Sequence, residues 1–283
     1  MTTITIPLDL TRFSERALPV AVALATALDG AVTLMTVRPE GLDGLSDDAY
    51  LLRLASGLSV PTCRRALVTT GPVDEAILDA IGREGDADSI VCMAAHGRTR
   101  PRLVLTSVSE ALVRKSTYPV ALVGPGSGPP TLPIDRMIVC LDGSTTAEAA
   151  LPVAADLARR LDAKLALLHV LDLPHSGHLV NGYLQTVAHR FGSIPTHTAV
   201  HTTNGASPAK VIAEHAAETG AGLIVMATHG RTGLRRAVLG SVAQGVVHRA
   251  PCPVIVVTAR RATTPSDPMA ASVAAGNGAM LRS

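Results

Sequence analysis

LDGSTTAEAALPVAADLARRLDA, residues 141–163, repeats LDLTRFSERALPVAVALATALDG, residues 8–30, at a separation of 133 residues. The same separation pairs further stretches: Val37 with Val170, Met93-Ala94 with Met226-Ala227, and His96-Gly97-Arg98-Thr99 with His229-Gly230-Arg231-Thr232. One register held over this length indicates an internal duplication. The sequence therefore predicts two copies of one domain in tandem.

The segment between the copies is GPGSGPPTLP, residues 124–133. Its Gly and Pro content cannot sustain a helix or a central strand, which is typical of a linker. We expect one domain over 1–125 and a second over 134–260. Residues 261–283 are rich in Pro, Gly and Ser without a sustained period, so we expect a disordered tail.

Within each copy, short apolar stretches alternate with Ala-rich or amphipathic ones, which favours right-handed crossovers and a parallel sheet. In the second copy, strands are predicted at 136–141, 164–170, 196–203, 223–228 and 253–258. Helices are predicted at 145–161, 208–219 and 238–249, with a further helix within 176–191. The predicted fold is α/β: two doubly wound, flavodoxin-like or Rossmann-like domains in tandem, each with a five-stranded parallel sheet.

Composition excludes several classes of protein. Hydrophobic residues make up 47% of the chain and aromatic residues 2%, which suits buried parallel strands under Ala-rich helices. A net charge of +2 is too small for a nucleic-acid-binding surface, and no apolar run reaches the roughly 18 residues that a membrane span needs. The scattered cysteines (Cys63, Cys92, Cys140 and Cys252) indicate reduced core residues in a cytoplasmic protein.

The sharpest local pattern is ATHGRTGLRRAVLGSV, residues 227–242, which follows the fourth strand of the second copy. A glycine-rich turn that enters a helix offers unpaired N–H groups and the positive end of the helix dipole to an anion. Gly230 would let the backbone approach a phosphate, and Gly240-Ser241 would supply N–H groups and a hydroxyl. Taken alone, the loop is equally a structural turn before a helix.

A carboxylate follows the first strand of the same copy, in LDGS at residues 141–144. The carboxyl ends of the first and fourth strands meet at the switch point of a doubly wound sheet, where ligands bind. Asp142 is therefore a candidate for a ribose or adenine contact. Because it precedes a helix, it is equally a candidate N-cap.

With these motifs, residues 1–260 resemble the universal stress protein family of the tandem kind. The family's adenine-nucleotide motif is Gly, two residues, Gly, nine residues, then Gly-Ser or Gly-Thr; the second copy has Ala227, Gly230 and Gly240-Ser241. The resemblance implies that Asp142 contacts adenosine, that Val170 meets adenine through its backbone, and that the phosphates of ATP are cradled by Gly230, Gly240, Ser241 and Val242. Ala227 adds one methyl group to this site, Arg231 would neighbour the phosphates, and Mg²⁺ could accompany ATP.

The loop of the first copy, AAHGRTRPRLVLTS at residues 94–107, is one residue shorter and has Thr106 in place of the glycine. Pro101 stiffens it, and the branched Thr side chain would crowd a phosphate oxygen. We expect weak or absent nucleotide binding in this copy. If it does bind, the residues would be Asp9, Val37, Gly97 and Ser107.

The family pairs domains through their last strands, and residues 120–123 and 254–257 are short apolar runs of this kind. The two strands could pair within one chain as a pseudo-dimer, with homodimerisation of two chains in addition. Alternatively, each strand lies inside its own sheet and its edge is covered by side chains.

The histidine pairs His175 with His178 and His197 with His201 could share a metal, but a solvated loop and a strand without Cys or carboxylate neighbours favour no metal site. His229 has a counterpart in His96, which favours a structural role. No nucleophile elbow, paired catalytic acids or P-loop is present. The sequence thus predicts an ATP-binding stress-response regulator acting through nucleotide-dependent conformation or association, and at most a weak ATPase. The alternatives are an interaction scaffold without nucleotide and a slow ATP hydrolase.

Overall fold

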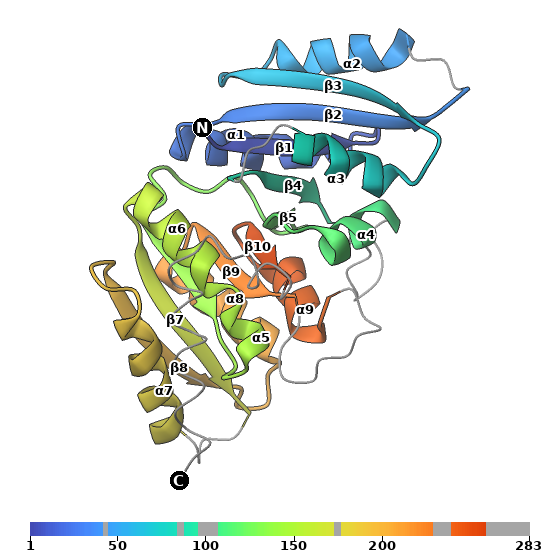
Figure 1. The fold of residues 1–283 in the computed structure, drawn as a ribbon. Helices are drawn as coiled ribbons and strands as arrows, with labels where there is room; N and C mark the ends of the chain where they lie inside the picture. The colour runs from blue at the N-terminus through green and yellow to red at the C-terminus, as the bar shows by residue number, and fades with distance from the viewer. Residues whose placement is uncertain (42–44, 84–87, 96–106, 173–176, 229–238, 259–283) are drawn as a thin grey trace.

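The computed structural model describes residues 1–41, 45–83, 88–95, 107–172, 177–228 and 239–258. Its strands form one continuous ten-stranded sheet that runs through both halves of the chain (Figure 1). The strands of the first half are β1 Thr3–Leu8, β2 Ala31–Pro39, β3 Thr62–Thr69, β4 Ile90–Ala94 and β5 Val120–Val123. Those of the second half are β6 Arg136–Cys140, β7 Lys164–Leu171, β8 Thr196–Thr202, β9 Leu223–Ala227 and β10 Val254–Val257.

The two halves have the same strand order. Along the sheet the order is β3-β2-β1-β4-β5-β10-β9-β6-β7-β8, so each half reads 3-2-1-4-5 from its own edge. Pairing is parallel within each half. This order belongs to doubly wound nucleotide-binding folds, whose switch point lies between strands one and four. The prediction of two tandem α/β domains with five-stranded parallel sheets is confirmed.

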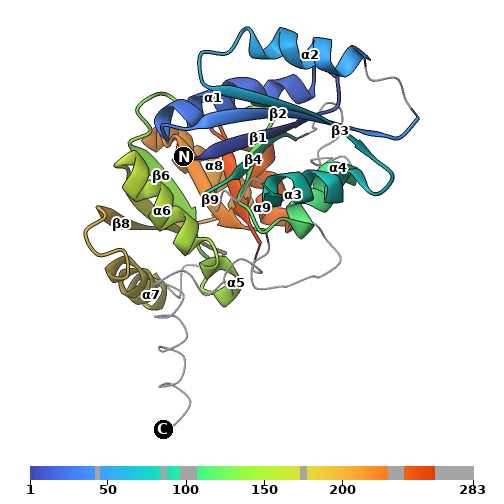
Figure 2. The same cartoon turned by 45° about the horizontal axis from the view of Figure 1, so that its top comes forward.

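Helices cover both faces of the sheet. The first half contributes η1 Ser14–Ala17, α1 Leu18–Ala27, α2 Leu45–Ala55, α3 Val73–Arg83 and α4 Ser107–Lys115. The second contributes α5 Thr145–Glu148, α6 Leu151–Leu161, α7 Gly177–His189, α8 Pro208–Thr219 and α9 Ser241–Arg249. One hydrophobic core joins α1, α2, α6 and α7, and the other joins α3, α4, α8 and α9. Figure 2 shows α1 and α2 on one side of β1–β3 and α3 on the other.

The central strands are apolar because both of their faces are covered. All five residues of β4 and of β9 are buried. The edge strand β3 is largely exposed. Cys63 lies on this edge and is exposed, whereas Cys92, Cys140 and Cys252 are buried. The expectation that all four cysteines are core residues is therefore wrong for Cys63.

One predicted helix is broken. The range 145–161 forms α5 and α6 as separate helices, with Pro152 in the first turn of α6. Proline has no N–H to continue the ladder of the preceding helix and its ring crowds the carbonyl one turn back, so it starts a new helix instead. The first half has the same break between η1 and α1, where Pro19 takes this place. The further helix predicted within 176–191 is confirmed as α7, Gly177–His189.

The two halves join through their last strands. β5 and β10 pair antiparallel, with Val120 opposite Val256, Ala121 opposite Ile255 and Leu122 opposite Val254. The predicted intramolecular pseudo-dimer is thereby confirmed. Each half hides the sheet edge of the other, which is an alternative to covering it with side chains. The expected domain boundaries stay a prediction, and the tail over 261–283 lies outside the described residues.

Candidate functional site

Each half has its switch point at the carboxyl ends of its first and fourth strands, β1 and β4 or β6 and β9. β5 and β10 run in opposite directions. The carboxyl ends of the first-half strands therefore point to the opposite side of the ten-stranded sheet from those of the second half. The turns that follow the strands supply the polar groups at each edge.

In the second half, the turn after β6 is organised around Asp142. Its Oδ1 accepts hydrogen bonds from the Ser144 backbone N (3.0 Å) and from Ser144 Oγ (2.6 Å). Ser144 Oγ in turn accepts from the backbone N of Ala147 (3.1 Å), which makes Ser144 the N-cap of α5. The structure therefore assigns the cap to Ser144, and the interpretation of Asp142 as the N-cap is wrong. Asp142 instead orients the residue that caps the helix.

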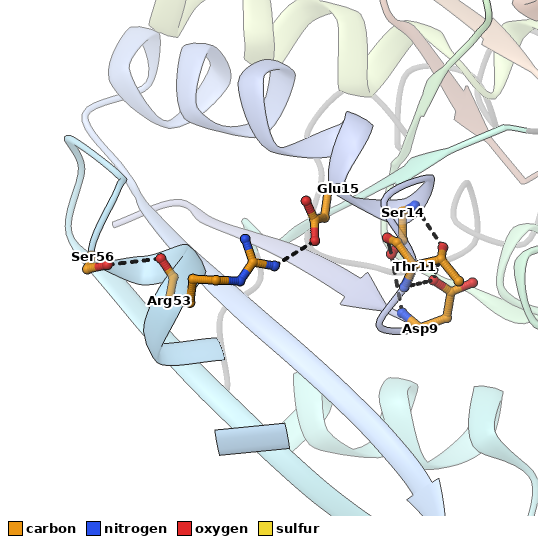
Figure 3. A network of polar contacts seen from close by, with 6 residues as sticks. All are labelled: Asp9, Thr11, Ser14, Glu15, Arg53 and Ser56. Carbon is orange, nitrogen blue, oxygen red and sulfur yellow. Dashed lines mark hydrogen bonds and ion pairs between the residues drawn. The ribbon is translucent and has the colours of Figure 1, made fainter. Parts of the chain in front are cut away.

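The first half builds the same turn around Asp9 (Figure 3). Asp9 Oδ1 accepts from the Thr11 backbone N (3.1 Å) and from Thr11 Oγ1 (2.6 Å), and Ser14 Oγ accepts from the Asp9 backbone N (3.4 Å). Partial burial by itself raises the pKa of Asp9, but the hydrogen bonds from Thr11 and Ser14 hold it below its ordinary value of 3.8. The carboxylate is therefore ionised at neutral pH.

The ends of the glycine-rich loop meet in the second half. The backbone N of Gly240 donates to the carbonyl of Thr228 at 2.7 Å, and the backbone N of Thr228 donates to Val257 at 3.0 Å. Gly240 is extended (φ −61°, ψ 155°) and stands as the N-cap of α9 without a side-chain cap. The first-turn N–H groups of a helix have no intrahelical partners, so α9 opens toward this edge with an anion-binding end.

The other predicted residues of the second half are distributed around this edge. Ala227 is the last residue of β9 and is buried, whereas Ser241 and Val242 are exposed in the first turn of α9. Val170, one residue before the end of β7, is half-buried on the face that α8 and α9 cover. Gly230 and Arg231 lie outside the described residues, as does His229. The structure thus brings Asp142, Val170, Ala227, Gly240, Ser241 and Val242 to one edge of the sheet.

The first half is similar in outline. Val37 is half-buried near the end of β2, as Val170 is in β7, and Ser107 is the exposed first residue of α4. Gly97, Thr106 and His96 lie outside the described residues. The turn after β1 differs from its counterpart at a position of positive φ: Leu10, with φ 61°, stands where the second half has Gly143, with φ 82°.

A cluster that the motif analysis missed lies beside each turn. In the second half, Glu148 Oε1 accepts from the hydroxyl of Tyr183 (3.1 Å) and Oε2 pairs with Arg190 Nη1 (2.8 Å). In the first half, Glu15 Oε1 pairs with Arg53 Nη2 at 2.8 Å. The available signal was the repeat itself, because Glu15 and Glu148, like Tyr50 and Tyr183, are separated by the same 133 residues.

The remaining candidate chemistry is sparse. Within the described ranges, no group of three or more His, Cys, Asp or Glu side chains could hold a metal ion. His201 instead meets His215 of α8, with ring centroids 4.7 Å apart. Burial raises the pKa of the Cys92 thiol to about 12, so this cysteine is unreactive. Across the same ranges, no helix is both long and apolar enough to cross a bilayer.

Known proteins resemble this chain over both halves. The model of the universal stress protein family matches residues 1–124 and again residues 133–258. A putative universal stress protein of Staphylococcus haemolyticus is 32% identical over 140 residues, which cover 43% of this chain and 83% of that protein.

Solved structures resemble it as well. A crystal structure of a universal stress protein from Archaeoglobus fulgidus superposes with a TM-score of 0.63 at 18% identity, covering 90% of this chain and 98% of that one. Another universal stress protein of that organism, solved in complex with dAMP, is 22% identical over 44% of this chain and 98% of that one, with a TM-score of 0.38. The matched fold, its duplication and the two family matches agree, and the chain belongs to the universal stress protein family.

Proposed function

We propose that the second half binds an adenine nucleotide, ATP, and that occupancy regulates the conformation or association of the protein. One observation carries this proposal: the 2.7 Å hydrogen bond from Gly240 to Thr228 sets the uncapped start of α9 at the carboxyl end of β9. β9 pairs with β6, whose following turn holds Asp142. An anion-binding helix end and a carboxylate thereby flank the switch point, where nucleotides bind in doubly wound sheets.

The described residues fit this ligand. Ala227, which replaces the first glycine of the family motif, is only 6% exposed, so its methyl group is packed within the protein. The Gly240 N–H is engaged by Thr228, so Gly240 would let a phosphate approach the backbone closely, while Ser241 would offer its backbone N–H group and its hydroxyl. Asp142 would accept from the nucleoside. Bound ATP would bring Mg²⁺ with its phosphates.

The first half is proposed to bind nucleotide weakly or not at all. Its turn after β1 carries the exposed side chain of Leu10 where the second half has a glycine. Its loop is also one residue shorter and lacks the glycine that caps α9. The expected stoichiometry is therefore about one ATP per chain.

Calorimetric titration of ATP into the wild type and into Gly240→Val tests this site. A branched side chain at the helix N-cap would fill the phosphate niche, so binding should fall at least about tenfold, which corresponds to 1.4 kcal/mol. Gly128→Val is the matched control, because Gly128 has no heavy atom within 4 Å of an added Cβ. Equal affinity in Gly240→Val and wild type would contradict the site.

Measurements on the same proteins distinguish the two alternative functions. A wild type that binds no adenine nucleotide would indicate an interaction scaffold. Turnover of ATP above about 1 per second would indicate an enzyme, since typical enzymes work at or above that rate. For the regulatory step, sedimentation velocity with and without ATP should show a change in shape or association that Gly240→Val loses.

A further inference from the structure

Glu148 is held by two side chains that lie far from it in sequence: Tyr183 in α7, and Arg190, which directly follows the end of α7. It ends α5, and its carboxylate accepts from the Tyr183 hydroxyl (3.1 Å) and pairs with Arg190 Nη1 (2.8 Å). The Glu148 and Arg190 side chains are 18% and 24% exposed, so the pair is largely shielded from solvent. Both oxygens of the carboxylate are thus engaged, which fixes its orientation as well as its position.

α5 depends on such an anchor. It has four residues, Thr145–Glu148, and it is separated from α6 by two alanines before Pro152. A single helical turn is unstable on its own, because the conformational entropy lost on forming it outweighs the free energy of the few hydrogen bonds that it makes. The two ends of α5 are therefore secured by side chains: Ser144 at its start and Glu148 at its end.

The start of α5 is also where the proposed nucleoside contact is held. Asp142 Oδ1 accepts both the backbone N and the hydroxyl of Ser144. A chain of contacts therefore runs from Tyr183 and Arg190 through Glu148 and α5 to Asp142. Burial, followed by the charges of Glu148 and Asp142, raises the pKa of Tyr183 well above its ordinary value of 10. Its hydroxyl therefore stays protonated as a donor.

The first half retains the glutamate–arginine pair of this arrangement, although its nucleotide loop differs. Glu15 pairs with Arg53, whose guanidinium lies 5.2 Å from the centroid of the Tyr50 ring (Figure 3 shows Glu15 and Arg53). Burial, then the charge of Glu15, raises the pKa of Tyr50 to about 12. Relative to the repeat, Arg190 stands four residues beyond the position of Arg53, because 190 minus 53 is 137, four more than 133. The two halves thus reach equivalent glutamates from different places: Arg53 lies within α2, whereas Arg190 follows the end of α7.

We propose that Glu148, Tyr183 and Arg190 are positioning residues for the nucleotide site: they lock α5 against α7 and so orient the Asp142 carboxylate toward the nucleoside. This inference rests on the proposed binding of ATP in the second half. It assigns the three residues a role without contact with the ligand. It also separates two parts of the site, because the phosphates are held by α9 and the nucleoside by the turn that α7 supports.

The test compares Glu148→Gln with its matched counterpart Glu15→Gln in the full chain. Glu148→Gln should lower the affinities for ATP and for adenosine by the same factor, about five- to tenfold, since only the nucleoside contact is misplaced. Glu15→Gln removes an equivalent ion pair from the half without the site and should leave both affinities unchanged. Gly240→Val should weaken ATP while leaving adenosine binding intact. These affinities can be measured by calorimetry and by competition.

A second readout needs no nucleotide. In the ligand-free protein, amide hydrogen exchange at Ser144 and Ala147 should accelerate in Glu148→Gln, because these amides donate to Asp142 and to the Ser144 hydroxyl. Tyr183→Phe, which keeps the Glu148–Arg190 pair, should give the same pattern with a smaller change. This variant also serves if Glu148→Gln fails to fold.

The outcomes are distinguishable. Wild-type affinities in both Glu148→Gln and Tyr183→Phe, or equal losses in Glu148→Gln and Glu15→Gln, would overturn the positioning role while the ATP site stands. Loss of ATP binding with unchanged adenosine binding in Glu148→Gln would overturn the positioning role as well. If the wild type binds no ATP, the proposed function fails, and exchange at Ser144 then decides alone: unchanged exchange in Glu148→Gln overturns the link between Glu148 and Asp142.

Discussion

Leu10 and Gly143 occupy equivalent positions in the turns after β1 and β6, and both have a left-handed backbone, with φ 61° and 82°. For an L-residue with a side chain this conformation costs about 1–2 kcal/mol, whereas glycine adopts it freely. The Leu10 side chain is 45% exposed and recovers little of this cost through burial. The first half therefore keeps the turn at the expense of strain.

Leu10→Gly should stabilise the protein by about 0.5 kcal/mol, since relief of strain exceeds the added flexibility of the unfolded chain. Gly143→Leu should destabilise it by about 1–2 kcal/mol for the opposite reason. The measurement is urea unfolding of both variants. A destabilised Leu10→Gly variant would show that the exposed leucine makes contacts worth more than its strain.

At the scale of elements, α8 packs against β8 through histidines. The rings of His215 on α8 and His201 on β8 lie 4.7 Å apart, and His197 and Glu218 are also near. Burial, then the neighbouring His201, lowers the pKa of His215 below its ordinary value of 6.5, while Glu218 acts in the opposite direction. The folded protein thus binds a proton at this site less readily than the unfolded chain does.

The sign of the pH dependence follows. Well above pH 6.5 neither state is protonated at His215. As the pH falls through this value the unfolded state gains a proton before the folded state does, so stability decreases. His215→Phe should flatten this decrease in unfolding free energy between neutral and mildly acidic pH. The exposed His178, replaced by Phe, serves as the control and should keep the wild-type slope. An unchanged slope in His215→Phe would exclude this histidine as its source.

At the scale of the whole molecule, α9 joins the two halves: it starts at the glycine-rich loop of the second half, and its last turns contact the residue that follows β5 of the first half. An added Cβ on Gly124, which follows β5, would lie 1.7 Å from the carbonyl oxygen of Val247 in α9. Arg16 of η1 donates to the carbonyls of Gly124 (3.4 Å) and Pro125 (3.1 Å). From the second half, Thr258 Oγ1, which follows β10, donates to the carbonyl of Ser116, which follows α4 of the first half (3.0 Å). The contacts of Gly124 with Val247 and of Thr258 with Ser116 thus join the two halves on both sides of the β5–β10 junction, and Arg16 holds the segment that follows β5.

Gly124→Ala should therefore destabilise the protein by about 1–3 kcal/mol, because the methyl group can fit only if α9 and β5 separate. Gly128→Ala, in the same linker but in open space, should change the stability by less than about 0.5 kcal/mol. Urea unfolding measures both. Equal stabilities would mean that the junction opens at little cost, so the pseudo-dimer would be looser than its contacts indicate.

The sequence alone determined the features that depend on local pattern. The 133-residue repeat established the tandem α/β fold, and α8 was predicted with the bounds observed, Pro208–Thr219. Its end signals are local: Ser207 caps it, Pro208 begins it and Gly220 ends it in the left-handed conformation. The loop 227–242 and Asp142 were found in the same way, from residue types at fixed spacing. The strand pairing between halves was anticipated only through the resemblance to the family.

Only the tertiary structure decided which distant residues meet. Tyr183 and Arg190 lie 35 and 42 residues from Glu148, and their contact exists because α7 packs on the face that also carries α5 and α6. Ser144, and not the candidate Asp142, caps α5, because the geometry of the turn places the Ser144 hydroxyl within hydrogen-bond distance of the Ala147 amide. Cys63 became exposed because β3 is an edge strand, a place set by strand order. Periodicity and spacing record what neighbouring residues do, whereas pairing order and helix packing arise from the whole chain at once.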